Sequence, residues 1–409
     1  MSEPKVSVIV AGAGYAGMLA TVRLAGKTRR RNIEIILVNG TGQFVERPRL
    51  HEFAANVPLP PRPIAEILRG TGVRFVEGIV QEVHPQSREI VVKTPQESRR
   101  FSYDYLLYAL GSVMDRDSVP GVREHAYTLS SAGPLSAEAL REVLPKLERM
   151  GGKVVVVGGG PTGIEAAAEF ADAYPGLHIR LVSRGEMGDV WGGQVQAYMV
   201  KALQRLGVAI RNKTVVVRVD ADSLVTEEGE TIPFDLCLWA GGFGVPALAR
   251  AAGLAVNTRG QVQIDPFMRS VSHPEIYAAG DAASPVEDAG APVRMAAYTA
   301  LVMGAHAADC LSQAIKGRPQ RPLSFAYAGQ GIALGRRDAV GFNNYPDDRP
   351  NRPLFTGGLA VQTRAFFVRL VAGLPHLERR WPGCFYWPGK GRVKAVRRSR
   401  ANETLMDTP

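Results

Sequence analysis

Two glycine-rich segments of one pattern, about one domain apart, constrain the fold of this chain more than any other feature. In the first, Gly12, Gly14 and Gly17 follow an apolar run and precede a stretch of small residues. This spacing between a strand and a helix is typical of dinucleotide sites. The first glycine permits a tight turn, the second lets a pyrophosphate approach the backbone, and the third lets the helix pack close to the sheet. The helix N-terminus then presents free N–H groups to an anion.

The second segment repeats this arrangement with Gly158, Gly160 and Gly163. Each segment is followed by a second apolar run, at residues 33–38 and 178–182. Either segment alone could be a chance glycine-rich turn, but two matches in two complete strand–helix–strand units make chance a poor explanation. The chain is therefore predicted to be α/β, with parallel sheets in two doubly wound units.

The composition limits the classes of protein and of partner. The chain has 409 residues, of which 45% are hydrophobic, and this is enough for two or three domains with real cores. The formal net charge of +10 indicates anionic partners such as nucleotide phosphates, nucleic acid or a membrane surface. Because much of the excess charge lies near the C-terminus, we predict no nucleic-acid partner. No run approaches the ~20 apolar residues that a membrane span needs, and a cytoplasmic location is expected.

The remaining patterns are weaker. Residues 73–101 alternate like antiparallel strands, and residues 208–232 look like a small meander. Beyond about residue 324, glycine, proline and arginine become more frequent and aromatic residues cluster. The three cysteines are far apart in sequence, which disfavours a disulfide-stapled secreted fold and excludes a dithiol redox centre of the C-x-x-C type. No metal site is predicted.

The residue that ends the second strand of such a unit is usually acidic, because its carboxylate binds the ribose hydroxyls. Here Asn39 ends the first of these strands, and Ser183 followed by Arg184 ends the second. An asparagine can still hydrogen-bond a ribose as donor and acceptor. In the second unit, no carboxylate would repel a 2′-phosphate, and a cation could hold one, which favours NADPH. The alternative is that Arg184 is an ordinary solvated surface charge.

Four further motifs carry a resemblance to a known family. Residues 103–111 are similar to a family strand that ends in Ala-Thr-Gly, with Leu110 in place of the threonine, and residues 235–241 are similar to its counterpart in the second domain. Residues 275–281 are similar to the late flavin motif, and residues 335–341 to the start of the C-terminal domain. With the two glycine-rich segments, these motifs resemble the FAD/NAD(P)-linked pyridine nucleotide oxidoreductase superfamily, in its type II NADH dehydrogenase and apoptosis-inducing-factor-like branch.

The resemblance implies two Rossmann-like dinucleotide-binding domains and a C-terminal α+β domain. It implies that FAD binds the first domain and that a nicotinamide nucleotide, NADH or NADPH, binds the inserted second domain. The implied boundaries are residues 1–115 and 255–322 for the discontinuous FAD-binding domain, 116–254 for the NAD(P)H-binding domain, and 323–409 for the C-terminal domain with its basic tail.

The resemblance also implies a set of site residues. Asp281 would meet the ribityl chain of the flavin, Val80 would lie by the adenine, and Glu165, the candidate catalytic residue, would lie near the nicotinamide and the flavin edge. From the residues alone, Asp281 could instead cap a helix and Glu165 could simply balance a helix dipole. Arg49, a candidate pyrophosphate or flavin contact, could belong to an ordinary basic loop. The cofactor-binding residues implied in all are Gly12, Gly14, Tyr15, Ala16, Gly17, Asn39, Arg49, Val80, Ala109, Gly111, Gly280, Asp281, Met295 and Ala296 for FAD, and Gly158, Gly160, Pro161, Thr162, Gly163, Ser183, Arg184 and Gly241 for the nicotinamide nucleotide.

In the implied reaction the cofactors carry the chemistry: NAD(P)H gives a hydride to flavin N5, and the reduced flavin passes electrons to an acceptor. In type II NADH dehydrogenases, two glutamines on the helix after the flavin aspartate are associated with a quinone. Met295 and Thr299 stand in their places, which is a departure from the family's quinone pattern. Two other functions stay open: a soluble reductase of a ferredoxin-like or small-molecule acceptor, and a nucleotide-sensing flavoprotein whose redox state controls binding to a partner.

The C-terminal region combines the ingredients of a surface-lying membrane anchor. Residues 360–374 have a helical pattern, aromatic residues occur at 381–387, and cations are spread over 390–400. The alternative is an ordinary domain that packs its apolar face on the FAD domain or on the second subunit of a homodimer. Peripheral contact with the inner face of the membrane and a homodimer therefore both stay open. The apolar face predicted for the helix consists of Phe367, Leu370, Val371 and Leu374.

Overall fold

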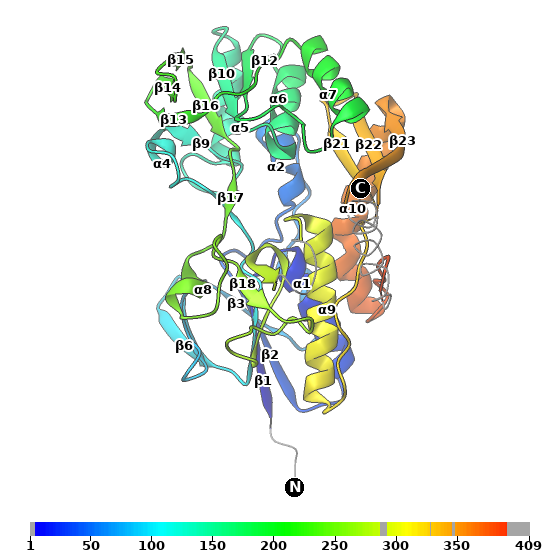
Figure 1. The fold of residues 1–409 in the computed structure, drawn as a ribbon. Coiled ribbons are helices and arrows are strands. Elements are labelled where there is room, and N and C mark those ends of the chain that lie inside the picture. The colour runs from blue at the N-terminus through cyan, green and yellow to red at the C-terminus, as the bar shows by residue number, and fades with distance from the viewer. Residues whose placement is uncertain (1–4, 287–292, 328, 346–347, 391–409) are drawn as a thin grey trace, which may run out of the picture.

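Two five-stranded parallel sheets, one above the other in Figure 1, organise the molecule. The computed structural model describes residues 5–286, 293–327, 329–345 and 348–390. Helices surround both sheets, and the C-terminal helix α10 (Gly357–Arg380) contacts both halves of the molecule. This is the α/β fold that the paired strand–glycine–helix patterns predict, so the predicted fold class is confirmed.

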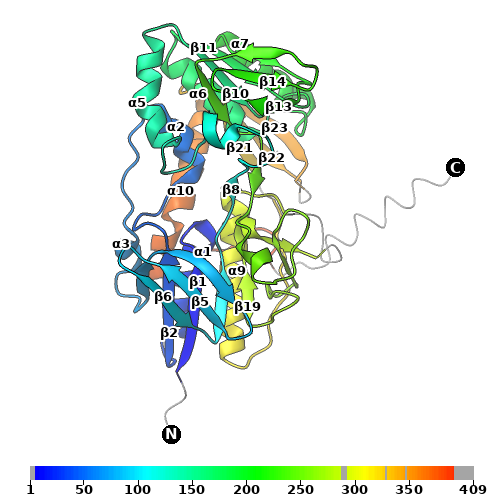
Figure 2. The same ribbon diagram turned by 90° about the vertical axis from the view of Figure 1, so that its left-hand side faces the viewer.

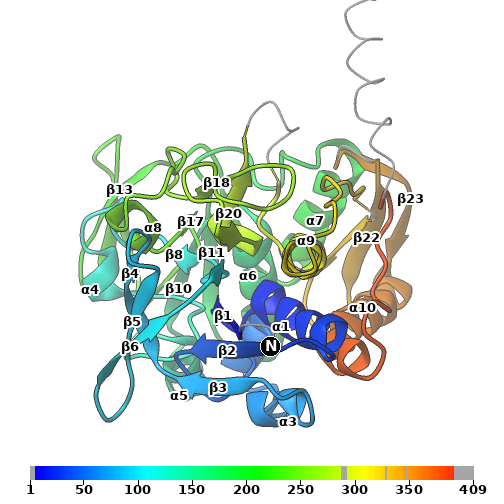
Figure 3. The same ribbon diagram turned by 90° about the horizontal axis from the view of Figure 1, so that it is seen from below.

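The first sheet contains the N-terminal strand and has the order β19-β7-β1-β2-β3, with every neighbouring pair parallel. Its central strand is apolar and residues 8–11 are buried, as expected for a strand covered on both faces. Two helices, α1 and α9, lie side by side on it (Figure 3). They approach closely because Gly304 has no side chain: a Cβ there would lie 2.2 Å from Ala16 O. The elements are β1 (Val6–Ala11), α1 (Tyr15–Thr28), β2 (Ile33–Asn39), β3 (Arg74–Glu77), β7 (Tyr105–Tyr108), β19 (Ile276–Ala278) and α9 (Ala297–Ile315).

The antiparallel strands predicted over residues 73–101 are found, with one correction. The strands β4 (Ile79–His84), β5 (Glu89–Lys93) and β6 (Ser98–Ser102) form an antiparallel sheet. The first strand of the range, β3, instead joins the parallel sheet beside β2. A four-residue strand carries too little alternation to distinguish a parallel from an antiparallel neighbour.

The second sheet repeats the first around β10, in the order β12-β11-β10-β16-β9. The meander predicted over residues 208–232 begins later than expected, because β12 extends the parallel sheet and only the next three strands are antiparallel. The elements are β9 (Ala126–Tyr127), α5 (Ala137–Glu148), β10 (Lys153–Val157), α6 (Pro161–Ala173), β11 (His178–Val182), α7 (Gly193–Arg205), β12 (Ala209–Arg211), β13 (Val216–Val219), β14 (Ser223–Thr226), β15 (Thr231–Pro233) and β16 (Leu236–Trp239).

Short elements connect the two halves. The strands β8 and β17 pair where the chain passes between the sheets, and α2 extends from the first half into the hydrophobic core of the second (Figures 1 and 2). The connecting elements are η1 (Arg47–Arg49), α2 (Leu50–Ala54), α3 (Ile64–Leu68), β8 (Val113–Met114), α4 (Val122–His125), β17 (Phe243–Gly244), α8 (Leu248–Ala251), β18 (Val262–Ile264), η2 (Gly280–Ala282) and β20 (Ala283–Pro285).

The C-terminal region is a three-stranded antiparallel sheet followed by a long helix: β21 (Gly329–Ala333), β22 (Ala339–Asn344), β23 (Pro350–Thr356) and α10 (Gly357–Arg380). The helix predicted at 360–374 is confirmed and is longer than expected. Its predicted apolar face is split, since Leu374 is buried whereas Phe367 and Leu370 are 56% and 37% exposed. An exposed apolar row, called here the α10 stripe, follows the helical spacing and consists of Leu359, Phe366, Leu370, Leu377 and Trp381.

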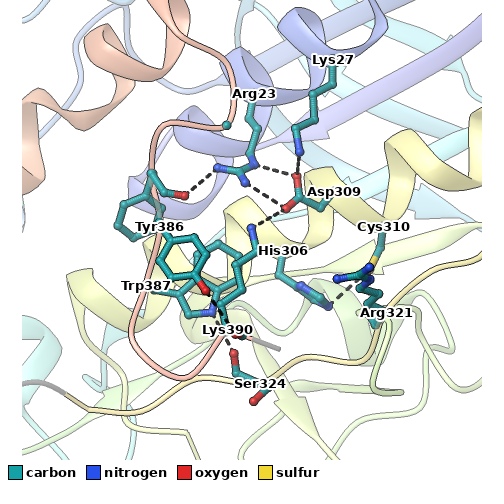
Figure 4. Close-up of polar contacts among 12 residues, drawn as sticks. Arg23, Lys27, His306, Asp309, Cys310, Arg321, Ser324, Tyr386, Trp387 and Lys390 are labelled. Atoms are coloured by element: carbon teal, nitrogen blue, oxygen red, sulfur yellow. Dashed lines mark hydrogen bonds and ion pairs between the residues drawn. The ribbon is translucent and has the colours of Figure 1, made fainter. Parts of the chain in front are cut away.

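A charged cluster fastens the end of the described chain to the first half (Figure 4). Arg23, which is buried on α1, donates to Asp309 of α9 at 2.7 Å and to Glu378 of α10 at 3.0 Å. Lys27 and Lys390 also pair with Asp309. Removing one member of a buried charge cluster leaves its partners uncompensated, at a cost of several kcal/mol. The cluster therefore holds α10 and the segment after it against α1 and α9.

Two residues assigned to the anchor from the sequence instead contact the protein itself: Trp387 is buried, so its assignment is wrong, and Lys390 is half-buried in an ion pair. The Trp387 indole is fully buried, and its N–H donates to Ser324 O at 2.8 Å. Lys390 bonds Asp309 at 3.2 Å and lies 4.1 Å from the centre of the Trp387 ring. A tryptophan that buries this much apolar surface and satisfies its N–H is more stable in the core than at an interface. The rest of the predicted basic tail lies outside the described residues.

Candidate functional site

The first glycine-rich turn is tightly packed except where a ligand would lie. A Cβ at Gly12 would lie 2.4 Å from Ala109 O, and a Cβ at Gly17 would lie 1.9 Å from Gly12 O. The φ of Gly12 is +100°, a conformation that side chains disfavour. At Gly14, by contrast, no described atom outside its own stretch of backbone lies within 4 Å of the Cβ position. The turn therefore leaves open space at the N-terminus of α1, where a pyrophosphate could bind.

The second turn repeats this geometry between β10 and α6. A Cβ at Gly158 would lie 2.3 Å from Ala240 O, and a Cβ at Gly163 would lie 1.9 Å from Gly158 O. The Cβ position of Gly160 again has no described atom within 4 Å outside its own stretch of backbone. Pro161 and Thr162 begin α6 immediately after this open space. The structure thus brings both sets of predicted glycines into the same type of site.

Asn39 closes the end of β2 over the first turn. Its Oδ1 accepts a hydrogen bond from Ala13 N at 3.0 Å, and its Nδ2 donates to Thr41 O at 2.9 Å. Gly78 N donates to Asn39 O at 2.8 Å and so brings the start of β4, with Val80, to the same edge. Asn39 and Val80 therefore lie beside the first turn, on the side where a Rossmann unit binds ribose.

Asp281 lies in a polar group at the ends of β7 and β19. Ser112 Oγ donates to Asp281 Oδ2 at 2.7 Å, and Arg47 Nη1 donates to Ser112 O at 2.8 Å. The helix-cap alternative is wrong for Asp281, because the N-caps of η2 and α9 are Ala279 and Ala296. Sequence reasoning missed Arg47 and Ser112. The basic run at residues 46–51 contains both Arg47 and Arg49, and the sequence-based interpretation chose Arg49.

Arg49 occupies a different place, in a charged network rather than at the first turn. Its Nε donates to Glu52 Oε2 at 2.8 Å, and its Nη1 lies 3.6 Å from Glu46 Oε2. With Arg364, Arg49 and Glu52 line a cavity of about 230 Å³. Of the two arginines, Arg47 is therefore the one that contacts the Asp281 group.

Glu165, in the second turn of α6, meets three distant segments. Its Oε1 accepts from Ala333 N at 3.0 Å and from Arg364 Nε at 3.2 Å, and its Oε2 lies 4.0 Å from His51 Nδ1. Arg364 also donates to Glu52 Oε1 at 3.1 Å. These contacts go well beyond dipole compensation, because they join α6 to α2, β21 and α10. No local pattern could reveal Arg364, which is 199 residues away from Glu165 in sequence.

Several buried polar atoms near this network have no hydrogen-bond partner among the described residues: the Tyr15 hydroxyl, Glu46 Oε2 and His51 Nε2. Burial and, to a smaller extent, the Arg364 charge lower the pKa of His51 to about 3, so the imidazole is neutral near pH 7. An unsatisfied buried polar atom costs roughly 1–3 kcal/mol and calls for an explanation. Tyr15 begins α1 beside the first turn. Open space at the turn and the Tyr15 hydroxyl without a hydrogen-bond partner together fit a bound polar group.

The second ribose position has no carboxylate. Ser183 directly follows β11, and its Oγ lies only 2.2 Å from the Cβ position of Gly159, so the hydroxyl faces the second turn. Arg184 is exposed, and within the described ranges it has no ion-pair partner. Gly241 follows β16, where a Cβ would lie 2.9 Å from the Trp239 ring. The predicted residues of the second site thus surround one turn.

Met295 and Thr299 stand where type II NADH dehydrogenases have two glutamines. Met295 precedes α9, and Thr299 lies in its first turn. Thr299 is buried, and its Oγ1 donates to Arg294 O at 2.6 Å within its own turn. The hydroxyl hydrogen is therefore already used within the protein, and an electron acceptor would have to displace this bond. Met295 is half-buried just before the N-cap Ala296. Arg294 pairs with Asp348 at 2.9 Å, which neutralises the cation nearest to this helix start.

Solved structures with the same fold include the sulfide:quinone oxidoreductase of Aquifex aeolicus, with a TM-score of 0.75, 17% identity and coverage of 94% of this chain and 99% of that one. The NDH2 of Plasmodium falciparum gives a TM-score of 0.75 at 16% identity, with 93% and 99% covered. Both likenesses span the chain from the first sheet into the C-terminal region. They establish the two-dinucleotide-binding flavoprotein fold.

Sequence relatives agree with this fold. The demethylphylloquinone reductase NdbB of Synechocystis is 25% identical over 355 residues, which cover 83% of this chain and 87% of the relative. The type II NADH:quinone oxidoreductase of Staphylococcus epidermidis is 23% identical, with 90% and 96% covered. The resemblance inferred from the motifs is thereby confirmed.

The family model described as pyridine nucleotide-disulphide oxidoreductase matches residues 6–307. The match begins at β1, includes both glycine-rich turns and the Asp281 group, and ends within α9. It thus covers about three quarters of the chain and every element that forms the two turns. The chain belongs to the pyridine nucleotide-disulphide oxidoreductase family.

Proposed function

We propose that the protein is an FAD-dependent NAD(P)H:quinone oxidoreductase, similar in activity to type II NADH dehydrogenases. The observation that carries the proposal is the pair of equivalent turns, each with open space at its second glycine, Gly14 and Gly160. The names of the relatives support the acceptor class, since they include reductases of demethylphylloquinone and of ubiquinone. We propose FAD for the first turn and the nicotinamide nucleotide for the second, with domain boundaries after residues 115, 254 and 322.

Within this proposal, the chain binds and aligns two nucleotides. When bound, FAD supplies the redox chemistry, taking a hydride from the nicotinamide and passing electrons to an acceptor. Backbone N–H groups at the starts of α1 and α6 bind the two pyrophosphates beside Gly14 and Gly160. Asn39 binds the flavin-side ribose, and Asp281, oriented by Ser112, binds the ribityl hydroxyls.

In this proposal Glu165 is the carboxylate that orients the reacting rings. Its Oε1 is fixed by Ala333 N and Arg364, while Oε2 has His51 as a distant neighbour. The Glu165→Gln substitution keeps the shape and removes the charge. We expect kcat to fall while the FAD content stays unchanged. An unaltered kcat would exclude Glu165 from the reaction.

The acceptor is tested with a panel of acceptors for the FAD-loaded protein. Steady-state oxidation of NADH and NADPH is followed with a menaquinone analogue, a ubiquinone analogue, a ferredoxin and a dye. Fast turnover with the quinones and slow turnover with ferredoxin supports the proposal. The buried hydroxyl of Thr299 favours a second candidate, a reductase of a non-quinone acceptor, which the reverse pattern would establish. Slow turnover with every acceptor would instead favour the nucleotide-sensing flavoprotein.

We further propose that the α10 stripe contacts a membrane surface. Its side chains are exposed, with 61% of Phe366 and 57% of Trp381 accessible to solvent. The described part of the chain offers no helix that is both long and apolar enough to cross a bilayer. Large apolar side chains beside arginines are typical of surface-lying helices. Binding to vesicles tests the contact. If the stripe instead joins two copies in a homodimer, scattering will show a dimer that does not bind vesicles.

A further inference from the structure

A basic pocket lies at the C-terminal end of α10. The pocket has a volume of about 680 Å³, and three helices end at it: α1 near Arg29, α3 near Arg69, and α10 at Arg379 and Arg380. In Figure 3, seen from below, α1, α3 and α10 lie together on the side away from α8. Among the described residues, none that lines the pocket is acidic. In the described part of the chain, none of these four arginines has a carboxylate within ion-pair distance.

One of these guanidinium groups is held in place by the backbone. Arg379 donates from Nη1 to Glu66 O at 2.7 Å and to Arg69 O at 3.3 Å, and both carbonyls belong to the end of α3. Its other nitrogen atoms take no part in these bonds. A guanidinium fixed through one nitrogen presents a planar set of remaining donors, which suits the oxygens of a phosphate.

Helix dipoles alone do not explain the pocket. A basic residue near a helix C-terminus balances a partial charge of about half an electron. Here four arginines share one cavity, so a net positive charge remains after the dipoles are offset. The pKa of His376 in the same pocket is lowered first by burial and then by the charges of Arg379, which lines the pocket, and of Arg62, which does not, while Glu66 acts in the opposite direction. Like charges gathered around open space are stabilised by an anion.

The rim of the pocket is apolar and continuous with the α10 stripe. Leu377 and Trp381 line the pocket and also belong to the stripe, with 39% and 57% exposure. The Arg380 guanidinium lies 5.2 Å from the centre of the Trp381 ring, so a cation and an aromatic ring share the rim. A soluble anion would need no apolar rim, whereas a lipid brings a phosphate and hydrocarbon together. The combination therefore favours a phospholipid over a free phosphate.

We propose that this pocket binds the phosphate headgroup of an anionic phospholipid while the α10 stripe contacts the adjoining acyl region. The inference rests on the membrane contact proposed above and adds a preference for anionic lipid. Arg379, fixed to α3, and Arg69 bind the phosphate oxygens, and Arg380 with Trp381 covers the headgroup at the bilayer surface.

The test measures the binding of the full-length, FAD-loaded protein to vesicles of phosphatidylcholine with and without phosphatidylglycerol. Wild type should bind the mixed vesicles more tightly. The double variant Arg69→Gln/Arg380→Gln should lose roughly 30-fold of its affinity for mixed vesicles, since each arginine near an anionic surface contributes about fivefold. Its affinity for pure phosphatidylcholine should not change. The control double variant Arg250→Gln/Arg259→Gln removes the same charge far from α10 and should lose little, because distant charges are screened.

The outcomes separate the pocket from the membrane contact. If both double variants lose the same affinity, net charge explains the binding and the pocket inference is wrong. Leu377→Ser/Trp381→Ser should weaken binding to both kinds of vesicle, and if it has no effect on either, the stripe contact itself fails. If sn-glycerol 3-phosphate binds with an affinity that depends on Arg69 and wild type shows no preference for mixed vesicles, the pocket belongs to a soluble phosphate and the lipid assignment is overturned.

Discussion

At the scale of single residues, the two glycines Gly14 and Gly17 have different tasks although they belong to one motif. The Cβ position of Gly14 is open, whereas that of Gly17 lies 1.9 Å from a backbone oxygen. We predict that Gly14→Val folds, with about 1 kcal/mol lost from the helix N-cap, but is purified almost without FAD. Gly17→Val should fail to fold. FAD content from the visible spectrum and thermal unfolding of the apoprotein measure both effects, and full FAD occupancy in Gly14→Val would refute the first site.

A second prediction at this scale concerns Arg184 and nucleotide choice. Ser183 faces the second turn without a carboxylate, and the exposed Arg184 follows it. Arg184→Ala should raise KM for NADPH by an amount equivalent to roughly 1–3 kcal/mol, the value of a charge-assisted contact. KM for NADH should stay the same. Arg180→Ala, which replaces an exposed arginine on the preceding strand β11, is the matched control. Equal changes for both nucleotides would show that Arg184 does not contact the 2′-phosphate.

At the scale of elements, the segments that the sequence predicts well are those whose structure is decided locally. The strand, turn and helix from β1 to α1 follow from about twenty adjacent residues, and the same holds for β10 to α6. Elements decided by distant partners were not predictable. The register of β3 depends on β2, and the place of Arg364 depends on how α10 packs against α6 and α2. Likewise, Trp387 looked interfacial because its burial depends on α9 and on Ser324.

The packing of α9 against the C-terminal segment makes stability depend on pH. Burial lowers the pKa of His306 to about 4, and Asp309 has a smaller effect in the opposite direction. A histidine of the unfolded chain titrates near 6.5, so between pH 4 and 6.5 the unfolded state binds more protons and stability falls as the pH falls. His306→Gln should remove on the order of 2 kcal/mol of the loss between pH 7.5 and pH 5. Denaturant unfolding at both pH values tests this, with the exposed His178→Gln as control. Unchanged pH dependence in His306→Gln would contradict it.

At the scale of the whole molecule, the C-terminal region joins the parts on which the proposed function depends. Arg364 of α10 bonds Glu165 beside the second turn, and further along the same helix Glu378 bonds Arg23 of α1. One helix thus connects the proposed nicotinamide site, the first sheet and the surface that carries the α10 stripe (Figures 1 and 2). In this arrangement a quinone would approach the protein from the face that carries the α10 stripe.

The central claim is that one chain binds FAD and NAD(P)H at its two glycine-rich turns and transfers electrons from the nicotinamide to the flavin and then to a quinone. The most direct measurement is an anaerobic titration of the FAD-loaded protein with NAD(P)H, followed by a quinone, while the flavin absorbance is recorded. The account predicts that about one equivalent of nucleotide bleaches the flavin band and that the quinone restores it. A flavin band that stays unbleached with excess NADH and excess NADPH would contradict the account.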